Sequence, residues 1–275
     1  MTPGEYEFVC KFVRERSSIV LDSGKEYLVD TRLAPVARQF QLESVSALIA
    51  KLRATRDADL QTRVVEAMVT TETLFFRDRD PFESLRTTVL PDLIRRRAGE
   101  RQLNVWSAAC STGQEAYSFV MLVRQHFPEL ADWNVSVLAT DLSEEVLAKA
   151  RAGRYNQVEI NRGLPAALMV RYFKQTGTTW QLADDVRRAV EFRALNLTKP
   201  WPALPRMDLV FLRNVMIYFD VDTKKAVLQR AARVLCPDGY LLLGGAETTL
   251  NLDTPFQRVE NIKGGFHQLA KQVTR

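Results

Sequence analysis

The stretch VWSAACSTGQEAY, residues 105–117, joins an apolar strand, a loop of small residues and the start of a helix. Alanine, serine and glycine in such a loop let the backbone approach a ligand closely. The loop has one glycine, whereas a dinucleotide pyrophosphate requires the fuller G-x-G-x-x-G turn, so NAD and FAD are disfavoured. Two readings stay open: a cofactor without phosphates, or tight strand-to-helix packing with no ligand.

Apolar strands alternate with helices from about Leu103 onward. The expected strands are LNVWSAA, WNVSVLATD, VEFRALNL, MDLVFLRNV and GYLLLGG, the last after a PDG turn. Helices are expected between them, over 115–124, 143–151 and 223–235. This order predicts an α/β fold with a mostly parallel sheet covered on both faces. Ligands of such sheets bind at the carboxyl ends of the strands, so the loops after Ala109, Thr140 and Arg213 are candidates.

Three divisions of the chain are expected: a helical domain over 1–75, a linker over 76–90 and the α/β domain over 91–275. Apolar residues at helical spacing, such as Val9, Phe12 and Val13, indicate the first. Residues 154–190 interrupt the strand and helix alternation and predict an inserted antiparallel β-subdomain with a helix near 164–173. FQRVEN and GGFHQLA predict a hairpin that closes the sheet.

The composition excludes several classes of protein. The 275 residues are 46% hydrophobic and 26% charged, which is typical of a globular chain of two domains. No apolar run approaches the roughly 20 residues of a membrane span, and the charged N-terminus is no signal peptide, so we expect a cytoplasmic protein. Three separated cysteines and two histidines predict no disulfide framework and no metal site, and they disfavour His-based catalysis.

The net charge of +5 raises the possibility of nucleic-acid binding, which requires the basic residues to be clustered. Residues 1–70 hold ten Lys and Arg against ten Asp and Glu, and the excess elsewhere is thinly spread. Residues 95–97 form the one basic run, which is more typical of a solvated helix end than of a phosphate-binding patch. The sequence therefore predicts no nucleic-acid partner.

Polar residues follow the ends of the expected strands. Asp141 ends the second strand, where a carboxylate accepts hydrogen bonds from ribose hydroxyls; the alternative, a helix cap, is weakened because Ser143 is available for that role. Asn196 and Leu197 end the third strand and could face an adenine ring, or form a simple turn. RNVMIYFD places Arg213, Asn214 and Tyr218 beyond the fourth strand. An Arg–Asn pair has little use in a core, whereas Tyr218 could equally be a core aromatic.

Read together, TTETLFFRD, VWSAACSTGQEAYS, ATDLS, ALNL, DLVFLRNVMIYFD and PDGYLLLGGAE resemble the ordered motifs of CheR-type chemotaxis receptor methyltransferases. The resemblance covers about Thr70 to Glu247. It implies a helical N-terminal domain, a Rossmann-like class I methyltransferase domain with the inserted β-subdomain, and S-adenosylmethionine as cofactor with S-adenosylhomocysteine as product. It also implies methyl transfer to glutamates of receptors.

The resemblance carries over a set of site residues. Arg77 and Tyr218 would face the reacting methyl group. The implied cofactor contacts are Thr71, Thr73, Arg77, Glu115, Asp141, Asn196, Leu197, Arg213 and Asn214. Four positions depart from the family pattern: Thr71 stands where Asn is common, Ala116 where Pro is usual, and Gly245 and Ala246 where His and Ser are frequent.

Methyl transfer from a sulfonium to a carboxylate needs alignment and exclusion of water rather than a strong base, since a glutamate is already ionised at neutral pH. Arg77 offers a planar fork for a carboxylate, although a solvent-facing linker arginine is the alternative.

The resemblance implies that the partner is the cytoplasmic domain of a methyl-accepting chemoreceptor. We expect the present protein to be a monomer. Basic residues of the helical domain, Arg53, Arg56 and Arg63, could recognise it, but solvated helix faces explain them better. A receptor C-terminal peptide could add as a strand to the subdomain. Two alternatives stay open: a methyltransferase of another acceptor, and a cofactor-binding regulatory module that has lost catalysis.

Overall fold

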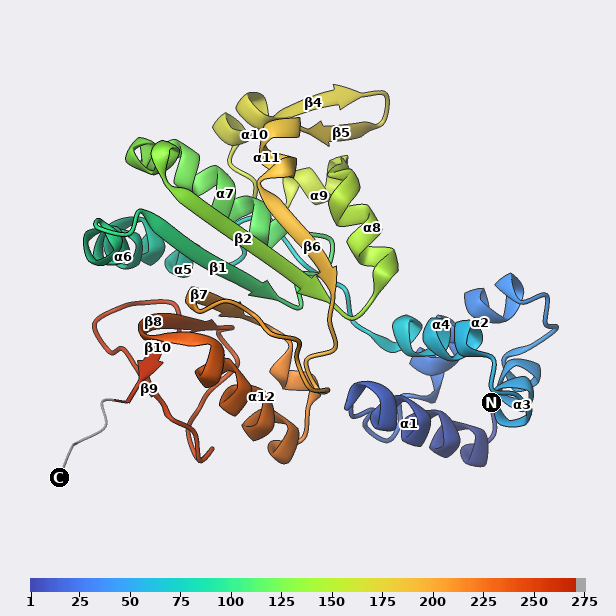
Figure 1. Ribbon diagram of the computed structural model, residues 1–275. Helices are drawn as coiled ribbons and strands as arrows, with labels where there is room; N and C mark the ends of the chain where they lie inside the picture. The colour runs from blue at the N-terminus through green and yellow to red at the C-terminus, as the bar shows by residue number, and fades with distance from the viewer. Residues whose placement is uncertain (271–275) are drawn as a thin grey trace. The chain divides into compact units, whose positions relative to one another are not determined.

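Two compact units make up the computed structural model, which describes residues 1–270 (Figure 1). The first unit is Met1–Thr70 together with Tyr218–Lys224, and the second is Thr71–Ile217 with the chain from Lys225 onward. The division therefore falls directly before Thr71. The predicted end of the α/β domain, residue 275, lies outside the described residues.

Four helices form most of the first unit: α1 (Pro3–Ser17), α2 (Glu26–Gln39), α3 (Val45–Ala54) and α4 (Ala58–Met68). Their starts follow from the sequence, because Thr2, Ser44 and Asp57 each accept a backbone N–H in the first turn of the helix that follows. The apolar stripes of α1, α3 and α4 are buried together. The predicted helical domain is confirmed.

A short segment from far along the chain completes this unit. Ile19 and Phe219 form an antiparallel bridge, and the Val20 N–H donates to the Tyr218 carbonyl at 3.0 Å. Arg14 pairs with Asp220 at 2.9 Å. Residues 218–224 thus fold with the helices, although they follow the fourth strand of the sheet.

The second unit is built on a seven-stranded sheet in the order β6-β2-β1-β7-β8-β10-β9. The first five of these strands pair in parallel, and β10 runs antiparallel to β8 and to β9. The strands are β1 (Gln102–Ala108), β2 (Asn134–Asp141), β6 (Val190–Ala194), β7 (Met207–Leu212), β8 (Leu235–Leu243), β9 (Phe256–Arg258) and β10 (Phe266–Leu269). The predicted parallel sheet and closing hairpin are confirmed.

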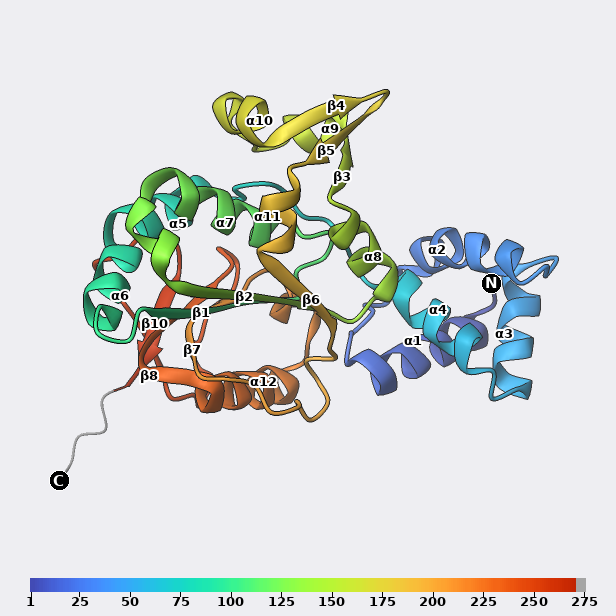
Figure 2. The ribbon, with the colours of Figure 1, turned by 45° about the horizontal axis from the view of Figure 1, so that its top comes forward.

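Helices cover both faces of this sheet, as Figure 2 shows for α7 and α12. The helical elements of this part of the chain are α5 (Arg79–Ser84), the π-helical η1 (Leu85–Val89), α6 (Leu90–Arg97), α7 (Gln114–His126), the 3₁₀ turn η2 (Pro128–Asp132), α8 (Glu144–Ala152), the 3₁₀ turn η3 (Met216–Tyr218) and α12 (Val221–Val234). Helix α7 is buried along most of its length, because its apolar residues continue around the helix.

The inserted subdomain is a three-stranded antiparallel sheet in the order β3-β5-β4. Its elements are β3 (Arg154–Asn156), α9 (Gln157–Asn161), α10 (Ala166–Tyr172), β4 (Phe173–Thr176), β5 (Thr179–Leu182) and α11 (Asp184–Arg188). Gly177, in the left-handed region at φ 59°, lies in the turn between β4 and β5. The predicted antiparallel insertion is confirmed.

One expected turn is wrong. Pro237, Asp238 and Gly239 lie inside β8, which begins at Leu235 and shifts its register against β7 between the Met207 and Leu209 pairs. A Cβ on Gly239 would lie 2.9 Å from the Asp208 carbonyl oxygen, so the glycine allows the two strands to approach at this irregularity.

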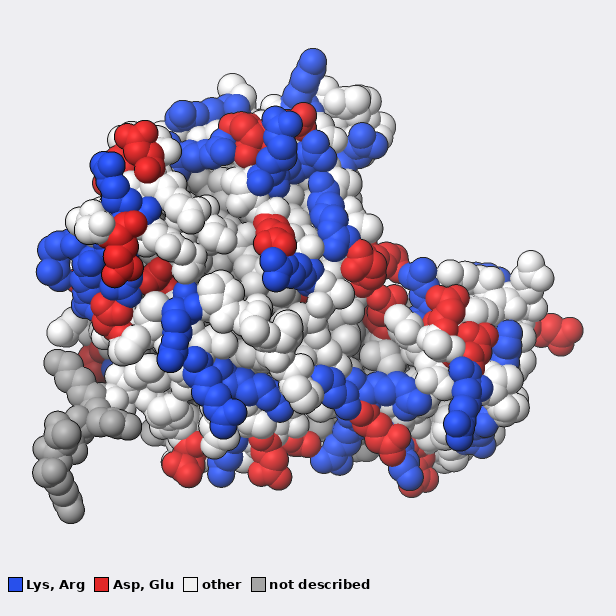
Figure 3. All heavy atoms as spheres, in the orientation of Figure 1, with Lys and Arg blue, Asp and Glu red and all other residues white. Residues whose placement is uncertain are grey.

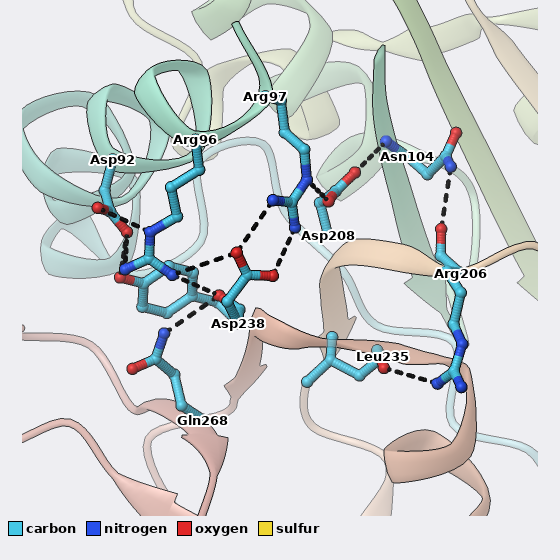
Figure 4. Close-up of polar contacts among 10 residues, drawn as sticks. Asp92, Arg96, Arg97, Asn104, Arg206, Asp208, Leu235, Asp238 and Gln268 are labelled. Atoms are coloured by element: carbon cyan, nitrogen blue, oxygen red, sulfur yellow. Dashed lines mark hydrogen bonds and ion pairs between the residues drawn. The ribbon is translucent and has the colours of Figure 1, made fainter. Parts of the chain in front are cut away.

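The solvated reading of the basic run 95–97 is also wrong for Arg97, whose side chain is 11% exposed (Figure 4). Arg97 donates to Asp208 at 2.7 Å and to Asp238 at 2.6 Å, and the second Asp208 oxygen accepts the Asn104 N–H at 2.8 Å. Through these contacts Arg97 links α6 to β8 and to the first residues of β1 and β7. Charge spacing alone did not predict this, because the carboxylates are more than a hundred residues away.

Acid is expected to remove the contribution of this ion pair. The Arg97 guanidinium holds the pKa of the Asp238 carboxyl below its usual value of 3.8. A carboxyl with a depressed folded-state pKa stabilises the fold above the unfolded value, and that stability is lost as the pH falls through the folded value. Asp238→Asn should therefore lower the melting temperature at pH 7, and the difference from the parent chain should close below about pH 4.

Thermal unfolding followed from about pH 7 to about pH 3 measures this effect. Asp253→Asn, at an exposed carboxylate, is the matched control and should leave the melting temperature unchanged across the range. A difference for Asp238→Asn that persists undiminished in acid would contradict the ion-pair origin.

Candidate active site

The loop that follows β1 is held in an unusual backbone conformation. Ala109, Ser111 and Gly113 all have positive φ, at 57°, 50° and 90°. A Cβ on Gly113 would lie 3.0 Å from the Ala150 Cβ, so a larger residue would strain the loop as well as crowd helix α8. The turn itself therefore requires glycine at position 113.

Asp141, at the end of β2, joins this loop to the start of α8. Its carboxylate is buried and accepts the Ser111 N–H at 2.8 Å and the Ser143 N–H at 3.1 Å. Ser143 is the N-cap of α8 and accepts the Val146 N–H, as the sequence predicted. These two bonds fix the Asp141 carboxylate between loop 109–113 and the start of α8.

Glu115, in the first turn of α7, and Arg213, directly after β7, form a buried ion pair. Arg213 donates to Glu115 at 3.0 Å, and the other Glu115 oxygen accepts the Ser107 hydroxyl at 2.8 Å. The Arg213 side chain is 1% exposed and its Nε has no partner among the described residues. The expectation that this arginine has little use in a core is wrong, because its fork serves three partners from different parts of the chain.

The other two partners of Arg213 lie in segment 71–78. Arg213 donates to the Arg77 carbonyl at 2.9 Å and to the Asp78 carboxylate at 2.8 Å. Phe76 and Asp78 have positive φ, at 47° and 61°, and the Phe76 N–H donates to the Ser118 hydroxyl at 2.9 Å. The backbone on both sides of Arg77 is thus fixed in a strained form.

The Arg77 side chain is half-buried, and its guanidinium lies 3.4 Å from the Glu72 carbonyl. Nearer the start of the segment, the Thr71 carbonyl accepts the Ser111 hydroxyl at 2.6 Å, and the side chains of Thr71 and Thr73 are exposed and half-buried. Segment 71–78 therefore lies along loop 109–113.

Asn196 and Leu197 follow β6, beside the end of β2. The Asn196 side-chain oxygen accepts the Thr198 N–H at 2.9 Å, the geometry of a local turn. The Leu197 side chain is buried, and its carbonyl accepts the Trp201 indole N–H at 3.0 Å. The Asn196 side-chain oxygen therefore stabilises a local turn, one of the two alternatives expected from the sequence. That Asn196 and Leu197 contact an adenine ring stays a prediction.

Sequence reasoning missed Glu247. Its carboxylate accepts four backbone N–H groups, from Asn214, Val215, Met216 and Gly244, at 2.7 to 2.9 Å. Asn214 has a positive φ of 58°, so this carboxylate holds a strained turn directly after Arg213. The sequence did carry a signal for this contact. Strands β7 and β8 are neighbours and Leu212 pairs with Leu243, so the loops that follow them, which contain Asn214 and Glu247, lie at the same end of the sheet.

Most of the predicted site residues come together in the second unit. Glu115, Arg213 and Arg77 are linked directly, and Thr71 and Asp141 both bond to Ser111. Tyr218 belongs to the first unit. No cluster that could hold a metal ion occurs within residues 1–270.

Two family descriptions match this chain in succession: the CheR methyltransferase all-alpha domain over residues 4–69, and the CheR methyltransferase SAM binding domain over residues 71–264. The chain belongs to the CheR methyltransferase family. S-adenosylmethionine as cofactor, expected from the sequence motifs, is confirmed, as is the helical domain that precedes the cofactor-binding domain.

Relatives extend over nearly the whole chain. "Chemotaxis protein methyltransferase 1" of Pseudomonas aeruginosa is 41% identical over 93% of this chain and 94% of that protein. "Chemotaxis protein methyltransferase 1" of Vibrio cholerae is 39% identical over 96% of both chains. "Chemotaxis protein methyltransferase Cher2" of Pseudomonas putida is 38% identical over 96% and 97%.

Across residues 1–270, no helix combines the length and the apolar character that crossing a bilayer requires.

Glu247→Gln is expected to slow methyl transfer by about 10- to 100-fold. A glutamine keeps one acceptor oxygen but turns an NH₂ group toward two of the four N–H donors, so the turn after Arg213 loses two charge-assisted hydrogen bonds. Turnover with labelled cofactor and S-adenosylhomocysteine affinity by calorimetry measure the effect. Glu260→Gln, at an exposed position, is the control; equal turnover in both variants would contradict this role.

Proposed function

We propose that this CheR-family enzyme transfers the methyl group of S-adenosylmethionine to glutamate side-chain carboxylates of chemoreceptor proteins, and so tunes chemosensory adaptation. The observation that carries the proposal is the Glu115–Arg213–Arg77 cluster: Arg213 directly follows β7, and Glu115, in the first turn of α7, bonds to Ser107 of β1, so the cluster is anchored near the carboxyl ends of these strands, where α/β sheets bind their ligands. The names of the relatives, which are chemotaxis methyltransferases, support the receptor as acceptor.

The cofactor's polar ends would be held by buried acceptors. Asp141 would accept the ribose hydroxyls, and Glu115 would accept the charged amino group of the methionine part. Asn196 and Leu197 would border the adenine, and the remaining family positions, Thr71, Thr73, Arg213 and Asn214, would complete the wall. The backbone amides of loop 109–113 lie beside Asp141 and leave no room for large side chains.

When bound, the cofactor supplies an electrophilic methyl group, which a carboxylate accepts by in-line displacement. Arg77 would hold the incoming carboxylate in that line through its planar fork. No general base is required, because a glutamate is ionised at neutral pH. The protein's contribution is alignment and exclusion of water, for which a fixed backbone around Arg77 is suited.

For Tyr218 the proposal rests on the motif RNVMIYFD, and its hydroxyl would position the reacting groups. Tyr218→Phe is expected to lower turnover by about tenfold while the melting temperature is kept, since one hydrogen bond to a charged group is removed. Single-turnover transfer and thermal unfolding measure the two quantities. Turnover equal to that of the parent chain would show that the ring acts by packing alone.

The inserted subdomain is the proposed docking place for a receptor C-terminal peptide. Strands β3 and β4 are the edges of its sheet, and an extended peptide can add to such an edge. Residues 154–190 hold six Lys and Arg against three Asp and Glu, and basic side chains gather over this subdomain in Figure 3. An acidic peptide would fit that basic surface. We further propose that the enzyme acts as a monomer in the cytoplasm.

Labelled-methyl transfer to the cytoplasmic fragment of a chemoreceptor tests the proposed function. We expect incorporation of label that alkali releases as methanol, since carboxyl methyl esters are base-labile, and its loss when the acceptor glutamates are changed to alanine. Alkali-stable label would show another acceptor. Cofactor binding without any transfer would show a regulatory module.

A further inference from the structure

Three aromatic residues connect the inserted subdomain to segment 71–78. Phe75 lies edge-on to Tyr155 of β3, with ring centroids 5.0 Å apart, and edge-on to Phe173 of β4 at 5.5 Å. Phe75 and Tyr155 are at most 1% exposed. Phe75 directly precedes the strained Phe76, so the subdomain packs against the segment that carries Arg77.

The Tyr155 hydroxyl reaches the other wall of the cofactor site. It donates to the carbonyl of Thr112, in loop 109–113, at 2.7 Å. Burial raises the pKa of the Tyr155 phenol well above its usual value, so the hydroxyl keeps its proton and remains a donor at neutral pH. One side chain of the insertion therefore contacts both loop 109–113 and segment 71–78.

A separate contact joins the same two parts of the chain. Gly163, with a positive φ of 88°, lies so close to segment 71–78 that a Cβ would be 2.0 Å from the Phe75 carbonyl oxygen. Beside it, Arg162 pairs with Glu72 at 2.6 Å. The backbone of the insertion thus approaches segment 71–78 as closely as the side chains do.

We infer that the inserted subdomain is part of the structure that binds the cofactor. Tyr155 is a positioning residue that holds loop 109–113 and segment 71–78 in their cofactor-binding arrangement. The inference rests on the proposed placement of the cofactor along these two segments. It gives the subdomain a role in the reaction that is separate from any peptide it docks.

A consequence follows from thermodynamic reciprocity. If the subdomain stabilises the cofactor-binding form of the two segments, bound cofactor must stabilise the subdomain by the same free energy. S-adenosylhomocysteine should therefore slow amide hydrogen exchange in 154–190, although those residues are not proposed to touch it.

Tyr155→Phe tests the inference, with Tyr172→Phe as matched control. Both tyrosines are buried in the subdomain, but the Tyr172 hydroxyl has no hydrogen-bond partner among the described residues. Loss of the Tyr155 hydroxyl should weaken S-adenosylhomocysteine binding about three- to tenfold by calorimetry, whereas the control should bind like the parent chain. Equal affinity for both variants, measured well below their melting temperatures, would overturn the inference even if Tyr155→Phe melts earlier.

Phe173→Leu is the second variant, in case Tyr155→Phe fails to fold. It reduces the ring contact with Phe75 and leaves the Thr112 hydrogen bond in place, so it should also weaken binding, and parent-like affinity would count against the inference. Asp141→Asn separates this question from the proposed site. If Asp141→Asn binds S-adenosylhomocysteine like the parent chain, the proposed cofactor placement fails; if only the subdomain variants do so, the inference alone fails.

Discussion

Replacing Arg77 by alanine is expected to lower methyl transfer by about 10²- to 10³-fold, the usual cost of removing one group that stabilises a transition state. Its guanidinium would hold the acceptor carboxylate in line, and its backbone is held by Arg213 on one side and by Ser118, through Phe76, on the other. S-adenosylhomocysteine affinity should fall much less than turnover. Single-turnover transfer with labelled cofactor and calorimetry give the two numbers.

Arg79→Ala is the control for this experiment. Arg79 is exposed and lies two residues further along the chain. Arg79→Ala makes the same change in net charge as Arg77→Ala but leaves the proposed site intact. Arg77→Lys should recover little activity, because an ammonium cannot offer the planar fork. Parent-like turnover in Arg77→Ala with unchanged cofactor affinity would remove Arg77 from the reaction and restore the reading of a linker arginine.

Arg213→Ala is expected to destabilise the second unit by about 3 to 5 kcal/mol, the range for breaking a buried ion pair by removing one partner. The change leaves the Glu115 carboxylate with Ser107 and no counter-charge, and frees the Arg77 carbonyl and Asp78. The melting temperature should fall by roughly 10 °C. Methyl transfer should be lost as well, because segment 71–78 is no longer held.

Two companion variants separate charge from shape. Arg213→Lys keeps the charge beside Glu115 but cannot serve all three partners, so its stability should lie between those of the parent and the alanine variant. The double variant Glu115→Gln/Arg213→Met removes both charges of the pair, so neither is left buried alone. Its stability should recover toward that of the parent chain, whereas its cofactor affinity should not. A melting temperature for Arg213→Ala within about 2 °C of the parent would contradict the buried pair as a stabilising element.

Much of the fold was predictable because it follows from local patterns. The strands β1, β2 and β7 are apolar runs bounded by helices, and the helix starts after Thr2, Ser44 and Ser143 carry capping side chains. The PDG turn failed because Pro237 and Gly239 read as a turn in isolation, whereas in the structure they lie in an irregularity within β8, between its pairings with β7 at Leu235 and at Tyr240. A local rule cannot include that pairing.

The candidate site was predictable residue by residue but not as a network. Asp141 stands out at the end of a strand, and Glu115 stands out at the start of a helix, each within a recognisable motif. Glu247 did not, because a carboxylate near a surface turn is ordinary until the four N–H groups that surround it are known. Tyr155 was hidden for the same reason, since its two contacts lie about 43 and 80 residues away in the chain.

The sequence by itself determined the helical first part, the parallel sheet with its insertion, and the family motifs. These depend on periodicity, capping and residue type, which act over a few residues. The tertiary structure alone decided which charges are buried and paired: Arg97 with Asp208, Arg213 with Glu115, and Glu247 with the turn at Asn214. Burial and pairing depend on which distant segments meet, and strand register sets that meeting.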